Sequence, residues 1–319
     1  MKSSNSNKTK SKKKSHSSKE NSDNVKSMRI GNSTCLFDEN CQEKWLNKFK
    51  VLVNNDNIYL LDIKEDNIES CFLGQGGSGF VFKYKLENTK LAIKFSLNRK
   101  NRNDEVKKIT DIQNLFHPNT SPNYRVTQYI EQGDTTIIIN GVEFKLYYIV
   151  MDLADGTIND LMCAYQEERN MSKLIGQIKH LTETINVLHK SSFAHRDIKP
   201  ENILLKGDLP VLADFGMSGC TKVKTIRRKG PKYWPNPEFL QACDEKLQDL
   251  DEQSDIFNLG CLFFYIFTGK YPIGLIDIKQ ELEHIDDELK NILMDMLQYS
   301  KDERLKNIGD AINILEKVI

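Results

Sequence analysis

The sequence predicts an α+β protein with two lobes, because strand-like segments fill its first half and helix-like segments fill its second half. In the first half, residues 80–86 place an aromatic or aliphatic side chain at every second position, which is the period of a strand. In the second half, apolar side chains at steps of three and four form one stripe along a predicted helix: Leu174, Ile178, Leu181, Ile185 and Leu188. Residues 256–267 are apolar at nearly every position and predict a buried central helix.

Further elements complete this order of strands followed by helices. Strands are expected at residues 91–95, 136–140 and 144–153. A helix between the first two of them is expected to begin at a cap provided by Asn103 or Asp104. Apolar side chains near the C-terminus mark a closing helix: Leu305, Ile308, Ile312 and Leu315.

Composition narrows the class of protein. The chain has 319 residues with 45 basic and 45 acidic side chains, and this balance argues against a dedicated nucleic-acid site, which needs a basic excess. Seven cysteines are scattered without a C-x-x-C pair, which favours reduced thiols in a cytoplasmic protein over a disulfide framework. The N-terminus lacks an apolar signal segment, and residues 256–267 are too few to cross a bilayer, so we expect no membrane span.

The N-terminal part is expected to contain a disordered tail at residues 1–30 and a folded extension at residues 31–69. Residues 1–26 hold eight lysines against two acidic residues, and they lack the apolar surface that a fold needs. The lysine-rich run at 10–14 is typical of a solvated tail, of a nuclear signal, or of a contact with an anionic surface. The extension has enough apolar residues for a short helix and one or two strands. A nuclear location through the tail, or action inside a host cell if the source is a bacterium or a virus, is the alternative to the cytoplasm.

A glycine-rich segment, Gly74-Gln75-Gly76-Gly77-Ser78-Gly79, is the first indication of a phosphate site. Glycines let backbone N–H groups approach phosphate oxygens closely, because no side chain intervenes. Dinucleotide-binding folds share this spacing, but there the glycines open a helix, whereas here the predicted strand at 80–86 follows. A strand on each side favours a loop that covers nucleotide phosphates, and a plain glycine-rich hairpin is the alternative.

A lysine in an apolar strand is the second indication. Lys94 closes the segment Leu91-Ala92-Ile93-Lys94, and a buried ammonium group needs an anionic partner. In a nucleotide site that partner is phosphate. The alternative is that Lys94 extends to solvent from an exposed face of the strand.

The most specific pattern is His195-Arg196-Asp197-Ile198-Lys199-Pro200-Glu201-Asn202, followed twelve residues later by Asp214-Phe215-Gly216. The Asp197 carboxylate can accept or orient the proton of an attacking hydroxyl, and Lys199 can balance charge on a phosphoryl group in transfer. Asn202 and Asp214 supply oxygen ligands that suit Mg²⁺. Together these residue types predict a phosphoryl-transfer site.

With these motifs in this order, the chain resembles the eukaryotic-type protein kinases from about Ser70 to Ile319. The resemblance implies a bilobal kinase fold, with a small β-rich N-lobe that carries one helix and a larger helical C-lobe. The implied boundaries are 70–151 for the N-lobe, 152–156 for the hinge and 157–319 for the C-lobe. It also implies ATP and Mg²⁺ as cofactors and proteins as substrates.

The resemblance implies roles for individual residues as well. The adenine ring of ATP would lie between apolar side chains, beside a gatekeeper and against backbone groups of the hinge. These are the apolar residues Leu73, Val81, Ala92 and Leu204, the gatekeeper Met151, and the hinge residues Asp152 and Ala154. The residues over the phosphates would be Gly74, Gly76 and Gly79. Lys94 would bind phosphate with Glu105 as its helix partner, Asp255 would anchor the catalytic loop, and Arg304 would pair with Glu238.

Three departures from the family pattern bear on these roles. Glu105 lies only eleven positions after Lys94, which is a short spacing for the partner glutamate. The usual A-P-E sequence is replaced by Asn236-Pro237-Glu238, which keeps the glutamate. Pro231 stands where Ser/Thr kinases usually have threonine, so substrate positioning is expected to differ there.

The catalytic loop favours Ser and Thr over Tyr as acceptors, because Lys199 lies two residues after Asp197, as in Ser/Thr kinases. Pro231 is closer to the tyrosine-kinase pattern and keeps that alternative open. We therefore predict an active Ser/Thr kinase whose basic activation segment is phosphorylated, first at Thr225 and second at Thr221. A nucleotide-binding scaffold with little turnover and a kinase-like enzyme that acts on a small molecule are the competing hypotheses.

Overall fold

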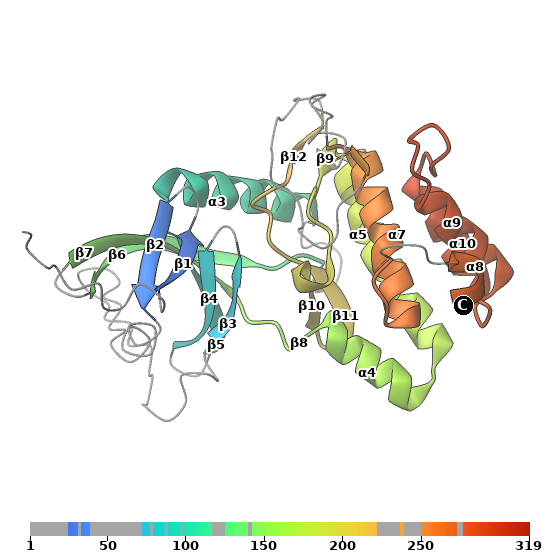
Figure 1. Cartoon of the computed structure of the whole chain (residues 1–319), viewed down its shortest axis with the longest axis horizontal. Coiled ribbons are helices and arrows are strands. Elements are labelled where there is room, and N and C mark those ends of the chain that lie inside the picture. Colours follow the sequence, from blue (N-terminus) through green and yellow to red (C-terminus); the bar gives the residue numbers. More distant parts are fainter. Residues whose placement is uncertain are drawn as a thin grey trace, which may run out of the picture.

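The computed structural model has an α+β architecture, with most strands at one end of the molecule and most helices at the other (Figure 1). The structure describes residues 25–30, 33–38, 72–76, 79–86, 89–96, 98–116, 125–139, 142–221, 237–238, 250–272 and 277–319. Across these ranges the predicted fold class is confirmed, since a β-rich lobe with a long helix precedes a larger helical lobe.

Five antiparallel strands form the sheet of the first lobe, in the spatial order β3-β4-β5-β7-β6. They are β3 (Phe72–Gly76), β4 (Gly79–Leu86), β5 (Thr89–Ser96), β6 (Tyr129–Ile139) and β7 (Val142–Asp152). β6 begins at Tyr129, well before the predicted start at residue 136. The predicted start was wrong because β6 pairs along almost the whole of β7, and this backbone pairing continues through polar residues such as Glu131 and Asp134.

The central strand β5 is the most buried strand of the sheet in the part that is described. Residues 91–96 are all buried, so this strand is covered on both faces. Phe95 makes edge-to-face ring contacts with Phe82 at 6.2 Å and with Tyr148 at 6.3 Å between centroids. Such contacts add to the apolar burial of three large rings and hold β4, β5 and β7 together.

One long helix, α3 (Arg99–Gln113), crosses the first lobe beside this sheet (Figure 1). It buries Val106, Ile109 and Ile112. The helix starts earlier than predicted, because its cap is Asn98, whose side chain accepts a hydrogen bond from the Asn101 amide at 3.1 Å. The first turn of α3 contains no acidic residue, although acidic residues often mark the start of a helix. The sequence therefore signals the start of this helix only weakly.

Six helices of the second lobe are α4 (Ile158–Glu168), α5 (Met171–Lys190), α7 (Glu252–Thr268), α8 (Ile278–Glu281), α9 (Asp287–Met296) and α10 (Ile308–Val318). The predicted stripe of α5 is buried, and α7 is buried along most of its length, as predicted. Gly260 lets α7 and α9 approach, because a Cβ there would lie 3.0 Å from the Cβ of Met296. The closing helix α10 begins after its Asn307 cap, so Leu305 lies before it. In the part of the chain that is described, we find no helix with the length and apolar character needed to cross a membrane.

Five short strands lie beside the loops that carry the motifs. They are β8 (Gly156–Thr157), β9 (Phe193–Ala194), β10 (Ile203–Lys206), β11 (Leu209–Leu212) and β12 (Gly219–Cys220). β9 pairs with β12, and β10 pairs with β11. This pairing brings the loop after β9 next to the turn after β11, which are the two segments that contain Asp197 and Asp214.

An N-terminal pair of strands overlaps the predicted tail. β1 (Val25–Ile30) and β2 (Ser33–Asp38) pair antiparallel, with Ile30 opposite Ser33. Residues 25–30, which were predicted as the end of a disordered tail, form β1 and pair with β2. The rest of the predicted tail, and residues 39–71 of the predicted extension, lie outside the described residues.

A buried ion pair joins a short segment to the helical lobe. Arg304 Nη1 lies 2.9 Å from Glu238 Oε1, and the two side chains are 0% and 2% exposed. The same guanidinium donates to the backbone carbonyls of Gln253, Gln298 and Tyr299 at 2.7, 2.9 and 3.0 Å. The ion pair that the family resemblance implied is therefore present. Although it is buried, the guanidinium is bonded to the Glu238 carboxylate and to three backbone carbonyls.

Replacement of Arg304 by methionine should lower the free energy of unfolding by about 3 kcal/mol, because it leaves the Glu238 carboxylate buried without its partner. Urea denaturation at constant m value measures this loss. Lys317→Met is the control, since Lys317 and its partner Glu288 are 65% and 59% exposed and such pairs contribute about 0.5 kcal/mol or less. An Arg304→Met loss no larger than that of the control would contradict the assigned role.

Candidate active site

The glycine-rich segment forms the connection between β3 and β4, in which Gly76 pairs with Gly79. At Gly79, φ is +152°, and a Cβ would overlap the backbone carbonyl oxygen of Phe95 in β5, so only glycine fits. At Gly74, φ is +155°, and the space that a Cβ would occupy is open. Strand, glycine segment and strand follow one another as predicted, and this leaves bare backbone next to the strand that carries Lys94.

Lys94 is the point where three elements meet. Its Nζ donates to Glu105 Oε1 of α3 at 2.6 Å and to Asp214 Oδ1 at 3.0 Å. The side chains of Lys94 and Glu105 are 7% and 9% exposed, whereas that of Asp214 keeps 32% of its surface. The short spacing between Lys94 and Glu105 is sufficient because α3 begins at Arg99, only three residues after the end of β5 at Ser96.

Burial and the neighbouring charges shift the pKa values of Lys94, Glu105 and Asp214 in different directions. Burial alone would lower the pKa of Lys94, but Asp214 and Glu105 outweigh burial and raise it well above its usual value. Burial also opposes ionisation of Asp214, but Lys94 lowers the pKa of that carboxyl to about 2. The Glu105 side chain is less exposed than that of Asp214. Burial therefore raises the pKa of Glu105, although Lys94 opposes this effect. One ammonium group therefore keeps Asp214 fully ionised at neutral pH.

The catalytic-loop motif is held by Asp255 at the first turn of α7, as the resemblance implied. Asp255 Oδ2 accepts from the His195 amide and Oδ1 accepts from the Arg196 amide, both at 2.7 Å. His189 Nε2 lies 3.0 Å from the same carboxylate, which is fully buried. Arg196 has φ of +67°, a conformation that costs free energy for a residue with a side chain. The bonds from Asp255 hold the loop in that conformation.

Asp197 lies at the centre of this loop and is 7% exposed. Its Oδ2 accepts from Lys199 Nζ at 2.8 Å and from Asn202 Nδ2 at 2.9 Å. Asn202 Nδ2 also donates to the backbone carbonyl of Asp197 at 2.7 Å, which fixes the amide plane. Burial raises the pKa of Asp197, and Lys199 opposes that effect. The carboxylate is therefore oriented by two donors and more basic than an exposed aspartate.

The segment Asp214-Phe215-Gly216 turns sharply beside this loop. Asp214 has φ of +58°, and Phe215 is fully buried. The Phe215 ring packs edge to face against His195, with centroids 5.3 Å apart. His195 Nε2 donates to the backbone carbonyl of Ala213 at 3.0 Å. These contacts connect the two motifs directly, so the positions of Asp197 and Asp214 depend on each other.

The residues assigned to the adenine side come from several elements. Ala92 and Met151 are opposite each other in the β5–β7 register, and Val81 is opposite Lys94. Leu204 comes from the second lobe, where it is opposite Thr157 of β8. Leu73 in β3 is 43% exposed. The strand registers thus bring Val81, Ala92 and Met151 close to Lys94, whereas Leu73 lies in β3 and Leu204 in β10.

The hinge is fixed by hydrogen bonds on both sides. The Asp152 carboxylate accepts from the Gln128 amide at 2.6 Å, and Lys206 Nζ donates to the Leu153 carbonyl at 2.6 Å. The Asp155 amide donates to the Leu205 carbonyl at 2.8 Å. The hinge backbone is therefore held in place between β6 and the β10–β11 hairpin, next to Ala154.

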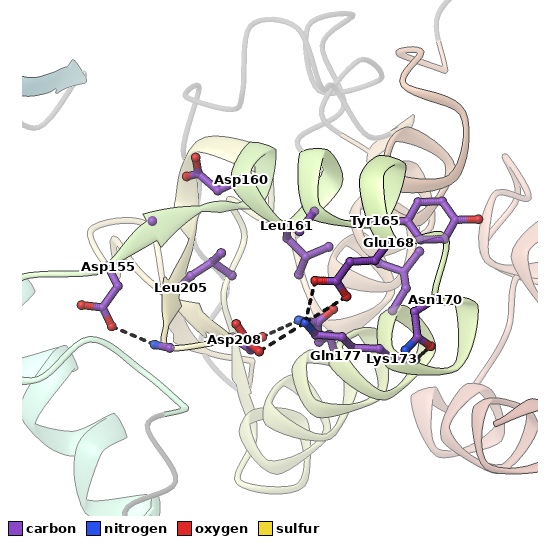
Figure 2. A pocket seen from close by; sticks show the side chains of 14 residues that line it. Asp155, Asp160, Leu161, Tyr165, Glu168, Asn170, Lys173, Gln177, Leu205 and Asp208 are labelled. Carbon is purple, nitrogen blue, oxygen red and sulfur yellow. Dashed lines mark hydrogen bonds and ion pairs between the residues drawn. The ribbon is translucent and has the colours of Figure 1, made fainter.

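A cavity of about 240 Å³ lies where the hinge meets α4, α5 and the β10–β11 turn. Figure 2 shows Asp155 bonded at one end of it and Lys173 between Glu168 and Asp208 at the other. The Asp155 carboxylate accepts from the Gly207 amide at 2.8 Å, and Lys173 lies 3.3 Å from both acidic partners. The hinge and α5 thus both contact the β10–β11 turn, at Gly207 and Asp208.

The oxygen donors of the site fit a magnesium ion that is also held by phosphates. Asn202 uses its Nδ2 for Asp197, so its side-chain oxygen could bind a metal ion, and Asp214 is ionised and partly exposed. Over the ranges that the structure describes, there is no cluster of three or more His, Cys, Asp or Glu that would hold a metal by itself. Mg²⁺ is usually held by one or two protein ligands together with substrate phosphates and water, so this donor set fits it.

Two contacts at the site were not predicted. His189 contacts Asp255, and Lys108 Nζ donates to the Gly216 carbonyl at 2.8 Å. The position of Lys108 three residues after Glu105 was the only available signal, because residues at that spacing share a helix face. His189 lies in the last turn of α5 and carries no sequence signal for this partner.

The activation segment, between Asp214 and Glu238, is described at residues 214–221 and 237–238. The Thr221 amide and hydroxyl both donate to the Ser192 carbonyl, at 2.8 and 3.3 Å. Arg196 Nε donates to the Leu250 carbonyl at 2.7 Å. The predicted phosphorylation site Thr225 and the substituted position Pro231 lie outside the described residues.

A model of the family described as "Protein kinase domain" matches residues 69–319, most of the chain. A glycine-rich segment between two strands, a lysine paired with two carboxylates and a buried aspartate in a two-lobed α+β fold agree with that family. The chain belongs to the protein kinase family.

Similar proteins include kinases of several organisms. "Probable serine/threonine-protein kinase irlC" of Dictyostelium discoideum is 25% identical over 66% of this chain and 15% of that protein. "Calmodulin-binding receptor-like cytoplasmic kinase 1" of Arabidopsis thaliana is 27% identical over 77% of this chain and 52% of that protein. "Aurora kinase" of Saccharomyces cerevisiae is 25% identical over 73% of this chain and 61% of that protein. The chain thus spans from about a seventh to about three fifths of the length of these relatives.

If the Asp197 carboxylate accepts the substrate proton, acidification should reduce kcat/KM for peptide phosphorylation, because only the ionised carboxylate can accept it. Because the folded-state pKa is raised by burial, activity is lost as the pH falls through a value above that of an ordinary aspartate. Lys199→Met removes the charge that opposes this effect, so the acid limb of the pH profile should move to higher pH. Lys270→Met, an exposed lysine paired with Glu281, is the control and should leave the limb unchanged. An acid limb at the same pH in both variants would show that Asp197 does not control it.

Proposed function

We propose that the chain is an active protein kinase that transfers the γ-phosphate of ATP to Ser or Thr hydroxyls of protein substrates. The observation that carries this proposal is the convergence of Lys199 and Asn202 on the buried carboxylate of Asp197. A scaffold that only binds nucleotide has no chemical need for a buried, oriented base. The presence of Lys94, Asn202 and Asp214 in bonded positions around it supports turnover further.

In the proposed reaction, the Asp197 carboxylate accepts the proton of the substrate hydroxyl. The hydroxyl oxygen forms a bond to the γ-phosphorus, the bond from that phosphorus to its bridging oxygen breaks, and ADP leaves. Lys199 balances negative charge on the phosphoryl group, and Lys94 binds phosphate oxygens while Glu105 holds it. Mg²⁺, when bound through Asn202 and Asp214, supplies positive charge beside the phosphates.

The adenine ring is proposed to bind between Leu73, Val81, Ala92 and Leu204, next to Met151 and to the backbone of Asp152 and Ala154, with Gly74, Gly76 and Gly79 over the phosphates. The fixed hinge supports this placement, because a rigid backbone presents donors and acceptors at a constant position. The proposed kinase domain is 70–319, divided at the hinge 152–156, and the proposed location is the cytoplasm.

The preference for Ser and Thr rests on Lys199, which is bonded to the base and so lies where the transferred group passes. A relative from Dictyostelium discoideum carries "serine/threonine-protein kinase" in its name, which is consistent with this preference. Pro231 opposes it, because proline has no side-chain hydroxyl that could bond to Asp197.

Asp197→Asn should reduce kcat about 100-fold or more while ATP binding and thermal stability stay close to those of the wild type, since a positioned base contributes about that factor. Transfer of labelled phosphate to a generic protein substrate measures the rate. Asp302→Asn, at a fully exposed acidic residue, is the matched control and should be fully active. If the Asp197→Asn enzyme kept more than about a tenth of wild-type kcat, the assigned base would be wrong.

Autophosphorylated protein should contain mainly phosphoserine and phosphothreonine, because the catalytic loop places Lys199 beside the base. Phosphoamino-acid analysis after incubation with ATP and Mg²⁺ measures the distribution, and the Asp197→Asn protein serves as the blank. Mostly phosphotyrosine would overturn the Ser/Thr assignment. A Pro231→Thr variant should be more active on Ser peptides, since it restores the hydroxyl.

A further inference from the structure

Two charged side chains of α3 point toward the active site from neighbouring turns of the helix. Glu105 accepts from Lys94, and Lys108 donates to the Gly216 carbonyl at 2.8 Å. The two residues are three positions apart, so they lie on one face of the helix. Lys108 is half-buried, whereas its neighbour Lys107 is exposed. The helix therefore contacts the site through one acidic and one basic side chain, each with its own hydrogen bond.

The carbonyl that Lys108 holds belongs to a residue in direct contact with Asp214. The Gly216 amide donates to Asp214 Oδ1 at 3.3 Å, the same oxygen that accepts from Lys94. A Cβ on Gly216 would lie 3.2 Å from that oxygen and 3.8 Å from Glu105 Oε2. A shift of Gly216 would therefore move the Asp214 carboxylate or break its bond to the backbone.

Asp214 needs such support because its backbone is in an unfavourable conformation. Its φ is +58°, and non-glycine residues in the left-handed region persist only where the surroundings hold them. Lys94 holds the side chain of this turn, and Lys108 holds the backbone two residues later. A bond from an ammonium group is stronger than one between neutral groups, so the Lys108 contact is a substantial part of that support.

We propose that Lys108 is a positioning residue that fixes the metal-binding orientation of Asp214 by holding the Gly216 carbonyl, and that it couples this orientation to the position of α3. The proposal rests on the proposed role of Asp214 as a magnesium ligand. Lys108 acts through Gly216 and is not itself placed against substrate. It follows that loss of Lys108 weakens magnesium-dependent nucleotide binding and leaves magnesium-independent binding unchanged.

The test compares Lys108→Met with Lys107→Met, a change of the same kind at the exposed neighbour. Titration calorimetry with a non-hydrolysable ATP analogue gives Kd in Mg²⁺ and in EDTA for the full-length chain. For Lys108→Met we expect Kd in Mg²⁺ to rise about 10-fold, the size of a lost charge-assisted hydrogen bond, and Kd in EDTA to stay within about 2-fold. KM for ATP should rise by the same factor as Kd, with a smaller change in kcat. Lys107→Met should match the wild type, and Lys108→Arg should recover most of the loss.

Each other outcome has a definite meaning. An equal loss in Mg²⁺ and in EDTA, or no loss at all, overturns the positioning role. So does a Lys108→Arg variant that binds as weakly as Lys108→Met. If Lys108→Met does not unfold cooperatively, Lys108→Gln, which is too short to reach the carbonyl, replaces it with the same expectations. Asp214→Asn separates this proposal from the proposed function, because unchanged magnesium-dependent binding in that variant would refute the metal site itself.

Discussion

The ammonium group of Lys94 is the interaction on which the rest of the site depends. It is the bonded partner of two carboxylates, one from the helix of the first lobe and one from the turn after β11. Without it, Glu105 and Asp214 would be two like charges in a poorly solvated place, and one of them would have to take up a proton or move away. The position of α3, the ionisation of Asp214 and the approach of the two lobes thus share one electrostatic cause.

The second lobe supplies the rigidity that this arrangement needs. Arg196 and Asp214 both have left-handed backbone conformations, with φ of +67° and +58°, and each lies next to or at a functional position. Fully buried Asp255 holds the first, and Lys94 holds the second. The His195 ring joins the two turns through the Ala213 carbonyl and the Phe215 ring. Strain at two neighbouring turns is therefore stabilised by groups from both lobes, which favours a single geometry over several.

Much of the site could be predicted because its residues occur in short continuous segments, such as 195–202 and 214–216. The residue types in such a segment indicate its chemistry even when the fold is unknown. The partner of Lys94 was harder, since the spacing to Glu105 depends on how soon α3 starts after β5, and the Asn98 cap gave no strong local signal. Lys108 and His189 were not predicted because their partners are distant in sequence and the contacts depend on tertiary packing. Strand β6 was predicted too short for a related reason, as its length follows from pairing with β7 rather than from its own side chains.

The bonds at Thr221 and Glu238 have a consequence for chain entropy. The Thr221 amide is bonded to Ser192, and Glu238 is paired with Arg304, so both ends of the segment 222–236 are fixed to the same lobe. The entropy lost on closing a loop grows only with the logarithm of its length, about 0.6 kcal/mol for each doubling. Insertions or deletions between these two anchors therefore have little effect on the stability of the folded body.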